Sequence, residues 1–396
     1  MKDWQIVKLG ELYSVHNGLS KGRQFFGTGF PFLTFSNVFN NWFLPNELDS
    51  LVQTTEKERV ACSIKCGDVF ITRTSETMNE LGMSSVALKD YPNATYNGFT
   101  KRLRPITDRV LPNFIGYYLR SPKFRGKFMA FSSMTTRASL ANNDLLNMEI
   151  ELPSMEVQNR IASILSRYDS LIANYKQQIK LLEEAAQRLY KEWFVDFRFP
   201  GHENTQIVDG VPEGWEKKRL ADIAYVIMGQ SPKSEFYNDK QEGLPFHQGV
   251  GSYGNRFVED YIYSTSLTKI AEQNSILFSV RAPVGRLNIT KNRIVIGRGL
   301  AALNHIDGKQ SFLFYMLKER FFKDDIVGNG SIFASISKNE LLNQKFIIPT
   351  DALVNRFDTI AKTMDCNIKN IDSQIRLLTE ARDRLLPKFM SGEVEV

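Results

Sequence analysis

Cations and hydroxyl groups on predicted loops are the residues of this chain best suited to chemistry. The segment 281–298 holds five basic residues and no acidic one. These five are Arg281, Arg286, Lys291, Arg293 and Arg298. Because Lys and Arg neutralise phosphates and Arg also reads base edges, the cluster predicts contact with a nucleic acid.

The first half of the chain carries comparable groups. A basic cluster lies between Asp90 and Asp108, and a second lies in the acid-free stretch 121–143. From these two we select Lys101, Arg102, Arg104 and Arg137. Loops with hydroxyl, amide and basic side chains occupy matched places in both halves and complete the candidate DNA-binding set with Ser20, Lys21, Arg23, Arg73, Thr74, Ser75, Ser231, Lys233, Gln248 and Lys338.

The sequence offers no constellation of groups for catalysis. Its four histidines are scattered, and there is no G-x-x-x-x-G-K-[ST] loop to hold phosphates. Phe25-x-Gly27-x-Gly29 matches a fragment of an adenosylmethionine-binding loop, but no Pro-Pro pair supplies the catalytic motif that should accompany it. Cys62-x-x-x-Cys66 lacks a second pair of zinc ligands. We therefore predict no catalytic residue and no metal site.

Length and composition indicate a folded protein of at least two domains. The chain has 396 residues, 42% of them hydrophobic and 24% charged. The net charge of +6 is unevenly distributed, since 1–150 and 212–350 are basic and the segments that follow each are slightly acidic. An odd count of three cysteines and no apolar run of about 18 residues predict reduced thiols and a cytoplasmic location, without a membrane partner.

The chain repeats itself. Trp4-x-x-x-Lys8-Leu9 recurs 211 positions later as Trp215-x-x-x-Arg219-Leu220, and each Leu is followed nine residues on by glycine, Gly18 or Gly229. Phe114-x-x-Tyr117 recurs as Phe312-x-x-Tyr315, 198 positions later. From Pro153 and Pro349 onward the offset is 196 without a gap. The sequence therefore predicts a tandem duplication in which the loops have diverged.

The two gap-free segments have the heptad pattern of long helices. Apolar residues alternate in steps of three and four over more than four heptads, which favours a coiled coil. The predicted seam is Ile161, Leu165, Tyr168, Ile172, Tyr175, Ile179, Leu182, Ala186, Leu189 and Trp193 in the first helix, and Phe357, Ala361, Met364, Ile368, Ile371, Ile375, Leu378, Arg382, Leu385 and Phe389 in the second. An antiparallel register sets Trp193 against Phe357, and sets Tyr168 against Arg382 with the guanidinium on the ring.

The segments before these helices look like mixed α/β modules. Short β-like runs at 67–72 and 275–280 are separated by Gly, Asn and Pro turns. We divide the chain into five parts: a recognition-type module over 1–152, a helical region over 153–199, a linker over 200–214, a second module over 215–348 and a second helical region over 349–396.

Several motifs resemble the specificity subunits of type I restriction-modification systems. Trp193-Phe194-Val195-Asp196-Phe197 followed by Pro212-Glu213-Gly214-Trp215 is similar to the middle of those subunits. The ending Leu385-Leu386-Pro387-Lys388-Phe389-Met390-Ser391-Gly392-Glu393 is similar to their C-terminus. Ser279-Val280-Arg281-Ala282-Pro283-Val284-Gly285 and Leu244-Pro245-Phe246-His247-Gln248-Gly249 match their second module, whereas in the first module only Gly82 matches the Pro-Val-Gly loop.

The resemblance implies a fold and a role. The fold is α+β: two mixed α/β target-recognition domains, joined by two long helices that form an antiparallel intramolecular coiled coil, in a pseudo-twofold tandem repeat. Each domain would read one half of a bipartite double-stranded DNA target, and the chain itself would not be an enzyme. Two methyltransferase (M) subunits with S-adenosylmethionine, and restriction (R) subunits with ATP and Mg, would be its partners and would carry out DNA methylation and cleavage.

Two alternatives belong to other classes of protein. A self-sufficient DNA-modifying enzyme would transfer methyl groups without partners, which the missing catalytic motifs oppose. A coiled-coil scaffold would bind no DNA, and salt-dependent retention on a polyanion resin would distinguish it.

Overall fold

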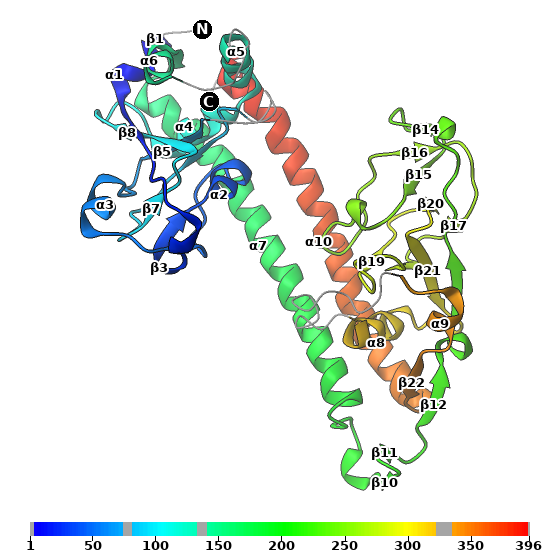
Figure 1. Cartoon of the computed structure of the whole chain (residues 1–396). Coiled ribbons are helices and arrows are strands. Elements are labelled where there is room, and N and C mark those ends of the chain that lie inside the picture. The colour runs from blue at the N-terminus through cyan, green and yellow to red at the C-terminus, as the bar shows by residue number, and fades with distance from the viewer. Residues whose placement is uncertain (1–3, 74–80, 133–140, 322–334, 395–396) are drawn as a thin grey trace. The chain divides into compact units, whose positions relative to one another are not determined.

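The computed structural model describes residues 4–73, 81–132, 141–321 and 335–394 (Figure 1). They form two compact units: the first unit contains residues 1–174 and 374–396, and the second contains residues 175–373. Two long helices, α7 (Met155–Phe194) and α10 (Asp351–Ser391), contribute one part to each unit. Each unit therefore combines one α/β module with segments of both helices. We call residues 4–152 the first module and residues 215–348 the second module.

The first module is built on two sheets and a strand pair. Its strands are β1 (Gln5–Lys8), β2 (Tyr13–Asn17), β3 (Phe26–Leu33), β4 (Leu51–Val52), β5 (Val69–Thr72), β6 (Ser84–Val86), β7 (Thr95–Tyr96), β8 (Thr100–Pro105) and β9 (Glu149–Leu152). Its helices are α1 (Leu9–Leu12), α2 (Phe35–Asn40), α3 (Glu56–Ala61), α4 (Pro112–Arg120), α5 (Pro122–Ser132) and α6 (Asn142–Asn147). The sheets have the orders β2-β8-β5-β6 and β4-β3-β7, and β1 pairs with β9.

The second module has the same plan. Its strands are β12 (Glu216–Arg219), β13 (Ala224–Met228), β14 (Tyr237–Asn238), β15 (Leu244–His247), β16 (Tyr263–Ser264), β17 (Ile270–Ala271), β18 (Ile276–Ser279), β19 (Leu287–Ile289), β20 (Ile294–Ile296), β21 (Leu300–His305) and β22 (Lys345–Ile348). Its helices are α8 (Gln310–Phe321) and α9 (Lys338–Leu342). The sheets have the orders β13-β21-β18-β19 and β14-β16-β15-β20-β17, and β12 pairs with β22. The predicted linker contains a two-stranded hairpin, β10 (Ile207–Val208) and β11 (Val211–Pro212).

Strand register confirms the duplication. In the first module Leu103 pairs with Val15 on one side and Val69 on the other. In the second module Leu303 pairs in the same way with Val226 and Ile276. Each module also holds one parallel pair, β3 with β7 and β15 with β20. The drifting offsets of the sequence therefore place insertions between strands of a common scaffold.

The glycines that follow the first strand of each four-stranded sheet explain one shared motif. A Cβ at Gly18 would lie 2.1 Å from the Asn97 carbonyl oxygen, and a Cβ at Gly229 would lie 2.2 Å from the Gly297 carbonyl oxygen. No side chain fits in such a contact. Both modules therefore need glycine where the chain passes the end of the parallel strand pair.

One inner strand of each four-stranded sheet, β5 or β18, is buried on both faces. Val69 and Ile71 pack into a core with α4 and α7, while Phe70 points into a second cluster beside β3 and β7. In the second module Ile276 and Phe278 pack toward α8 and the long helices, and Leu277 points the other way. Apolar residues on both faces of the strand thus place each four-stranded sheet between a helix layer and the other sheet of its module.

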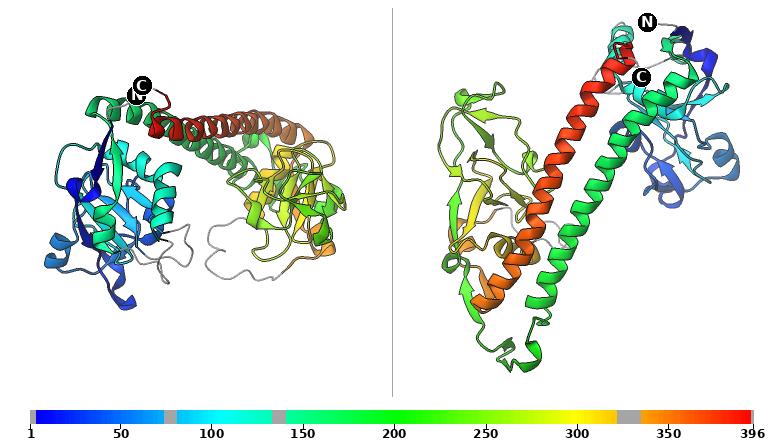
Figure 2. Two further views of the ribbon diagram at one scale, coloured as in Figure 1. Left: turned by 90° about the horizontal axis from the view of Figure 1, so that it is seen from above. Right: turned by 180° about the vertical axis from the view of Figure 1, so that it is seen from behind.

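The two long helices are antiparallel in each unit. They contain 40 and 41 residues, longer than the 33-residue seam, and Figure 2 shows each as a continuous helix. In the first unit Ile161 and Leu165 share a core with Phe389. In the second unit the rings of Trp193 and Phe357 are 6.2 Å apart, which confirms the predicted pairing. Every predicted seam residue is buried or half-buried, and the central positions 175–182 and 371–378 are only half-buried.

The prediction for Arg382 is wrong. Its guanidinium lies over the ring of Trp42, 4.9 Å from the centroid, and not on Tyr168. It also forms an ion pair of 2.6 Å with Asp169, one residue beyond Tyr168. A carboxylate holds a guanidinium more strongly than a phenol ring does, and heptad arithmetic does not include residues flanking the seam.

Among the described residues, no helix is long and apolar enough to cross a membrane.

Candidate nucleic-acid interface

The parallel strand pair of the second module brings two candidate residues together. Gln248 directly follows β15, and Arg298 is the second residue after β20. Because parallel strands end at the same edge of a sheet, residues 50 positions apart become neighbours. The Gly299 N–H donates to the Gln248 carbonyl oxygen at 3.1 Å, which fixes the two backbones relative to each other.

A hydrogen bond network joins Gln248 to a third candidate. The Ser231 hydroxyl donates to Gln248 Oε1 at 2.7 Å and accepts the backbone N–H of Arg298 at 3.2 Å. These residues and Lys233 line an open hollow with Gln230, Pro232, Ser234 and Tyr237. Lys233 lies on its rim with 82% of its side chain exposed. The structure thus brings four predicted residues into one polar site.

His247 supports this site from beneath. The buried imidazole contacts Ser252 Oγ at 2.7 Å and Asp260 Oδ1 at 2.9 Å. With one polar partner on each ring nitrogen, the ring holds the loop after Gln248 against the sheet. Sequence reasoning treated this histidine as an isolated residue, and nothing in its spacing indicated the network.

The equivalent place in the first module has different side chains. Ser20 is exposed, and its hydroxyl makes no hydrogen bond to the described residues. Gly98 takes the place of Arg298, and a Cβ there would lie 2.4 Å from Ser20 Oγ. Thr34 takes the place of Gln248, but its hydroxyl and N–H are both bonded to Asn37 at the start of α2. The two modules therefore carry different polar groups at the equivalent end of the parallel strand pair.

The loops after β5 and β18 are equivalent, with a shift from the predicted alignment. The Thr72 hydroxyl accepts the Met83 N–H at 2.9 Å, as the Ser279 hydroxyl accepts the Arg286 N–H at 2.8 Å. The Arg73 N–H donates to the Phe99 carbonyl oxygen. In the second module the matching bond runs from the Val280 N–H to the Gly299 carbonyl oxygen. Arg73 therefore corresponds to Val280 and not to Arg281. Arg281 is exposed, whereas Thr74, Ser75 and Arg137 lie outside the described residues.

Three further cations of the second module lie against acidic partners or the module itself. Lys291 forms an ion pair of 2.8 Å with Asp372 of α10 and contacts the Phe257 ring. Arg293 pairs with Glu272 at 3.2 Å, with both side chains exposed. Arg286 is half-buried. Lys291 thus holds the module on the helix, while Lys338 is exposed at the start of α9.

The three basic residues of β8 make contacts within the first module. Arg102 is 3% exposed, and its guanidinium donates to the Ser63 carbonyl oxygen at 2.6 Å. Lys101 is 4% exposed and donates to Asn142 Oδ1, and burial together with the charge of Arg73 lowers the pKa of this ammonium. Arg104 pairs at 2.6 Å with buried Asp68, which raises the pKa of its guanidinium. These cations bind the module's own backbone, amide and carboxylate groups, so each has a structural role in the module, and their contact with DNA stays a prediction.

Two of the remaining candidates of the first module differ in their surroundings. Lys21 forms an ion pair of 2.8 Å with Glu58, and only 15% of its side chain is exposed. Hydrogen bonds from Lys21 and Thr55 lower the pKa of Glu58 to about 2, so the pair is charged at neutral pH. Arg23 is exposed two residues further along.

Sequence reasoning missed a pair of clamps between the modules and the long helices. In the first unit the Tyr117 hydroxyl donates to Asp169 at 2.5 Å, and in the second the Tyr315 hydroxyl donates to Asp365 at 2.9 Å. Burial, with the adjacent carboxylate, raises the pKa of both tyrosines above the ordinary value. The repeats Phe114-x-x-Tyr117 and Phe312-x-x-Tyr315, and the offset of 196 between the two aspartates, were the available signal.

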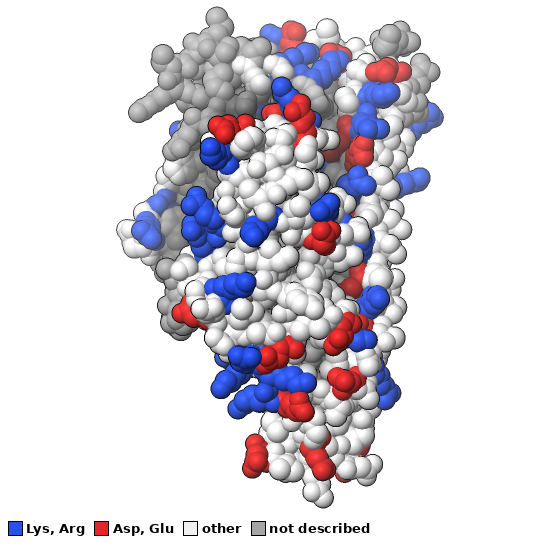
Figure 3. All heavy atoms as spheres, turned by 90° about the vertical axis from the view of Figure 1, so that its right-hand side faces the viewer, with Lys and Arg blue, Asp and Glu red and all other residues white. Residues whose placement is uncertain are grey.

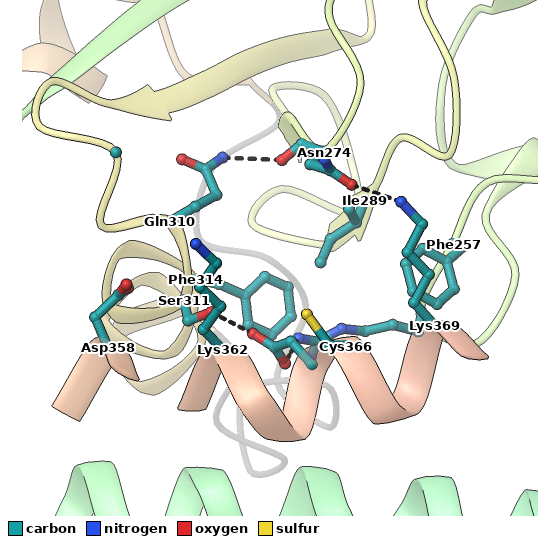
Figure 4. Close-up of a pocket in the computed structure, with 13 residues that line it drawn as sticks. Phe257, Asn274, Ile289, Gln310, Ser311, Phe314, Asp358, Lys362, Cys366 and Lys369 are labelled. Atoms are coloured by element: carbon teal, nitrogen blue, oxygen red, sulfur yellow. Dashed lines mark hydrogen bonds and ion pairs between the residues drawn. The ribbon is translucent and has the colours of Figure 1, made fainter. Parts of the chain in front are cut away.

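Arg256 completes the clamp of the second unit. Its side chain is 3% exposed, donates to Asp365 at 2.5 Å, and lies 3.8 Å from the centroid of the Phe314 ring. A cavity of about 320 Å³ adjoins it between α8 and α10 (Figure 4). Ser311 of α8 also donates to Asp365 across this cavity. The loop of Arg256 is thereby fixed to the long helix.

Charge is discontinuous on the one face of the molecule that Figure 3 shows. On this face Lys and Arg side chains form small groups separated by Asp and Glu. Among the described residues, no group of three His, Cys, Asp or Glu side chains could hold a metal ion. Cys62 is a buried free thiol whose pKa is raised by that burial.

Comparison with known proteins agrees with this architecture. Residues 1–184 and 212–377 match the family described as type I restriction modification DNA specificity domain. The chain is 28% identical to the putative type I restriction enzyme MjaX specificity subunit of Methanocaldococcus jannaschii, over all of this chain and 94% of that protein. It is 24% identical to the type I restriction enzyme HindI specificity subunit of Haemophilus influenzae, over the whole of both.

A solved structure has the same fold. The S subunit of a type I restriction-modification system from M. genitalium is similar with a TM-score of 0.59 and 14% identity, over 98% of this chain and 96% of that one. Because the family matches most of both halves, the chain belongs to the type I restriction-modification DNA specificity domain family. It is a specificity subunit, which recognises DNA and leaves catalysis to other subunits.

Proposed function

We propose that each module reads one half of a bipartite double-stranded DNA target, and that α7 and α10 set the distance between the half-sites. The duplication carries this proposal. Two modules with the same sheet order and register, but different exposed side chains at the equivalent edge, are suited to two different short sequences.

The helices would act as a spacer. The seam spans 33 residues in each helix, 161–193 and 357–389. At about 1.5 Å per residue this is a length of about 50 Å. That length corresponds to roughly 15 base pairs, at about 3.4 Å per pair. The outward faces of α7 and α10, which are largely exposed and charged, would dock two methyltransferase subunits.

In this proposal the partners supply the chemistry. The methyltransferase subunits bring S-adenosylmethionine and methylate adenine at N6 in each half-site. Restriction subunits with ATP and Mg would join them, and the assembly would work in the cytoplasm, where its DNA substrate lies. This chain would contribute recognition and geometry.

Methylation-sensitive sequencing of host DNA, with and without the gene for this chain, tests the proposal. We expect a methylated bipartite motif that disappears when the chain is removed. Insertion of one heptad into both α7 and α10 should lengthen the spacer of that motif or abolish methylation. An unchanged spacer with full activity would overturn the role of the helices, and an unchanged methylome after deletion would overturn the function.

A further inference from the structure

We propose that Gln248 and Arg298 are the base-reading donors of the second module, and that Ser231 is a positioning residue that fixes the Gln248 carboxamide. The ligand is the major-groove edge of two purines in the second half-site. This inference rests on the proposed function, because it assumes that the second module reads a half-site.

The backbone of the site is rigid. The Gly297 N–H donates to the His247 carbonyl oxygen at 2.8 Å, and the Val280 N–H donates to the Gly299 carbonyl oxygen at 2.9 Å. Three segments of the module therefore meet at one point. The backbone of such a scaffold loses little conformational freedom on binding, which favours specific recognition.

The Ser231 hydroxyl has no proton left to donate to a base. Its proton goes to Gln248 Oε1, and one lone pair accepts the Arg298 N–H. Its effect is to fix the rotation of the carboxamide. Within the described part of the chain, Gln248 Nε2 donates to no protein group, and one lone pair of Oε1 remains.

Arg298 is the second free donor. Its side chain is exposed, and among the described residues its guanidinium has no ion pair or hydrogen bond. This contrasts with the cations of β8 and with Lys291, whose charges are held by the protein. This edge therefore places an exposed planar fork next to a fixed carboxamide.

The donors match purine edges. Arg pairs with guanine O6 and N7, and Gln pairs with adenine N6 and N7. The remaining Oε1 lone pair and the free Nε2 of Gln248 supply the acceptor and donor that adenine needs. Both contacts use a purine N7, so N7 is the atom to remove in a test.

The experiment uses the full chain assembled with its methyltransferase subunits, after methylome sequencing has defined the target. Duplexes carry 7-deazaguanine or 7-deazaadenine at one purine of the second half-site at a time. For wild type we expect one position of each kind to weaken binding about tenfold or more. R298A should weaken unmodified target binding about ten- to a hundredfold and no longer respond to the 7-deazaguanine position. Q248A should behave likewise toward 7-deazaadenine.

Ser231 is tested by non-additivity. S231A should weaken specific binding about threefold to tenfold, S231T should restore it, and S231A/Q248A should bind no more weakly than Q248A. S20A is the matched comparison: Ser20 occupies the same place in the first module without an amide to hold, so the effects of S20A and Q248A on binding should be additive. Circular dichroism confirms that each variant is folded.

Three outcomes would count against these assignments. Equal weakening of target and scrambled DNA by R298A and Q248A would identify phosphate contacts and overturn base reading. Additive effects of S231A and Q248A would overturn the positioning role. If wild type bound target and scrambled duplex equally, the proposed function itself would fail, and that result is distinct from a failure of the variants alone.

Discussion

The two modules share one scaffold but differ in what fills its central strands. In the first module β8 carries buried Lys101 and Arg102, whereas the equivalent positions of β21 are Ala301 and Ala302, also buried. Buried cations need acceptors, and the first module supplies the Ser63 carbonyl and the Asn142 amide. The difference teaches that a basic cluster in the sequence can be internal structure and does not by itself mark a DNA contact.

The clamps differ in a related way. Both units place a tyrosine of the module on an aspartate of a long helix, but the compensating cation has a different origin. In the first unit it is Arg382 from the opposite helix, and in the second it is Arg256 from the module's own loop. The position equivalent to Arg382 is Ala186, which is fully buried. Duplication thus preserved the carboxylate and let the cation change place.

Exchange of a module tests the independence of the two halves and should have the largest effect. Replacing residues 219–350 with the same segment of a relative should change the second half-site completely and leave the first unchanged, because each unit has its own core. Methylome sequencing of the chimera measures both. Changes in both half-sites would show that the modules are coupled.

Removal of the clamp carboxylate should destabilise the second unit more than the first. Asp365→Ala leaves Arg256, whose side chain is 3% exposed, with Glu183 at 3.4 Å as its one carboxylate among the described residues, and should cost about 3 kcal/mol. Asp169→Ala should cost about 1–2 kcal/mol, because Arg382 is more exposed and keeps Asp383. Hydrogen exchange in α8 and α4, with chemical unfolding, gives the two values. A larger loss for Asp169→Ala would contradict this ranking.

Arg281 tests whether the loop after β18 reads DNA. Arg281 is exposed and belongs to the second module, and Arg73 of the first module is not its counterpart. Arg281→Ala should therefore weaken specific binding by about 1–3 kcal/mol at the second half-site only. Titration of target and scrambled duplexes measures the difference. If neither affinity changes, Arg281 is not part of the interface.

The smallest expected effect concerns two lysines at matched loops. Lys233 is largely exposed, so Lys233→Ala should weaken binding to all sequences slightly and lower the salt dependence of log K by about 1. Lys21 is held by Glu58, so Lys21→Ala should change that slope less. Binding at several salt concentrations compares them, and equal slopes would show that the Glu58 pair opens on DNA.

The sequence by itself determined the architecture of this protein. The heptad seam and the gap-free offset of 196 defined two antiparallel helices, and Trp193 lies against Phe357 as that register requires. Tandem matches around Gly18 and Gly229 defined two equivalent modules. Periodicity and close backbone approach are local constraints, so they leave a pattern in one sequence. The five-part division of the chain stays a prediction, since contacts group the helix halves with different modules.

Only the tertiary structure decided which charged groups remain available. Arg102 lies on β8 and Arg298 follows β20, yet the first guanidinium donates to a backbone carbonyl in the core, and the second is exposed with no partner among the described residues. The carbonyl that accepts from Arg102 belongs to a residue 39 positions away, and residue type says nothing of whether such a partner is near. The free energy of a charge depends on the acceptors and water that surround it, and these are set by the packing of distant segments.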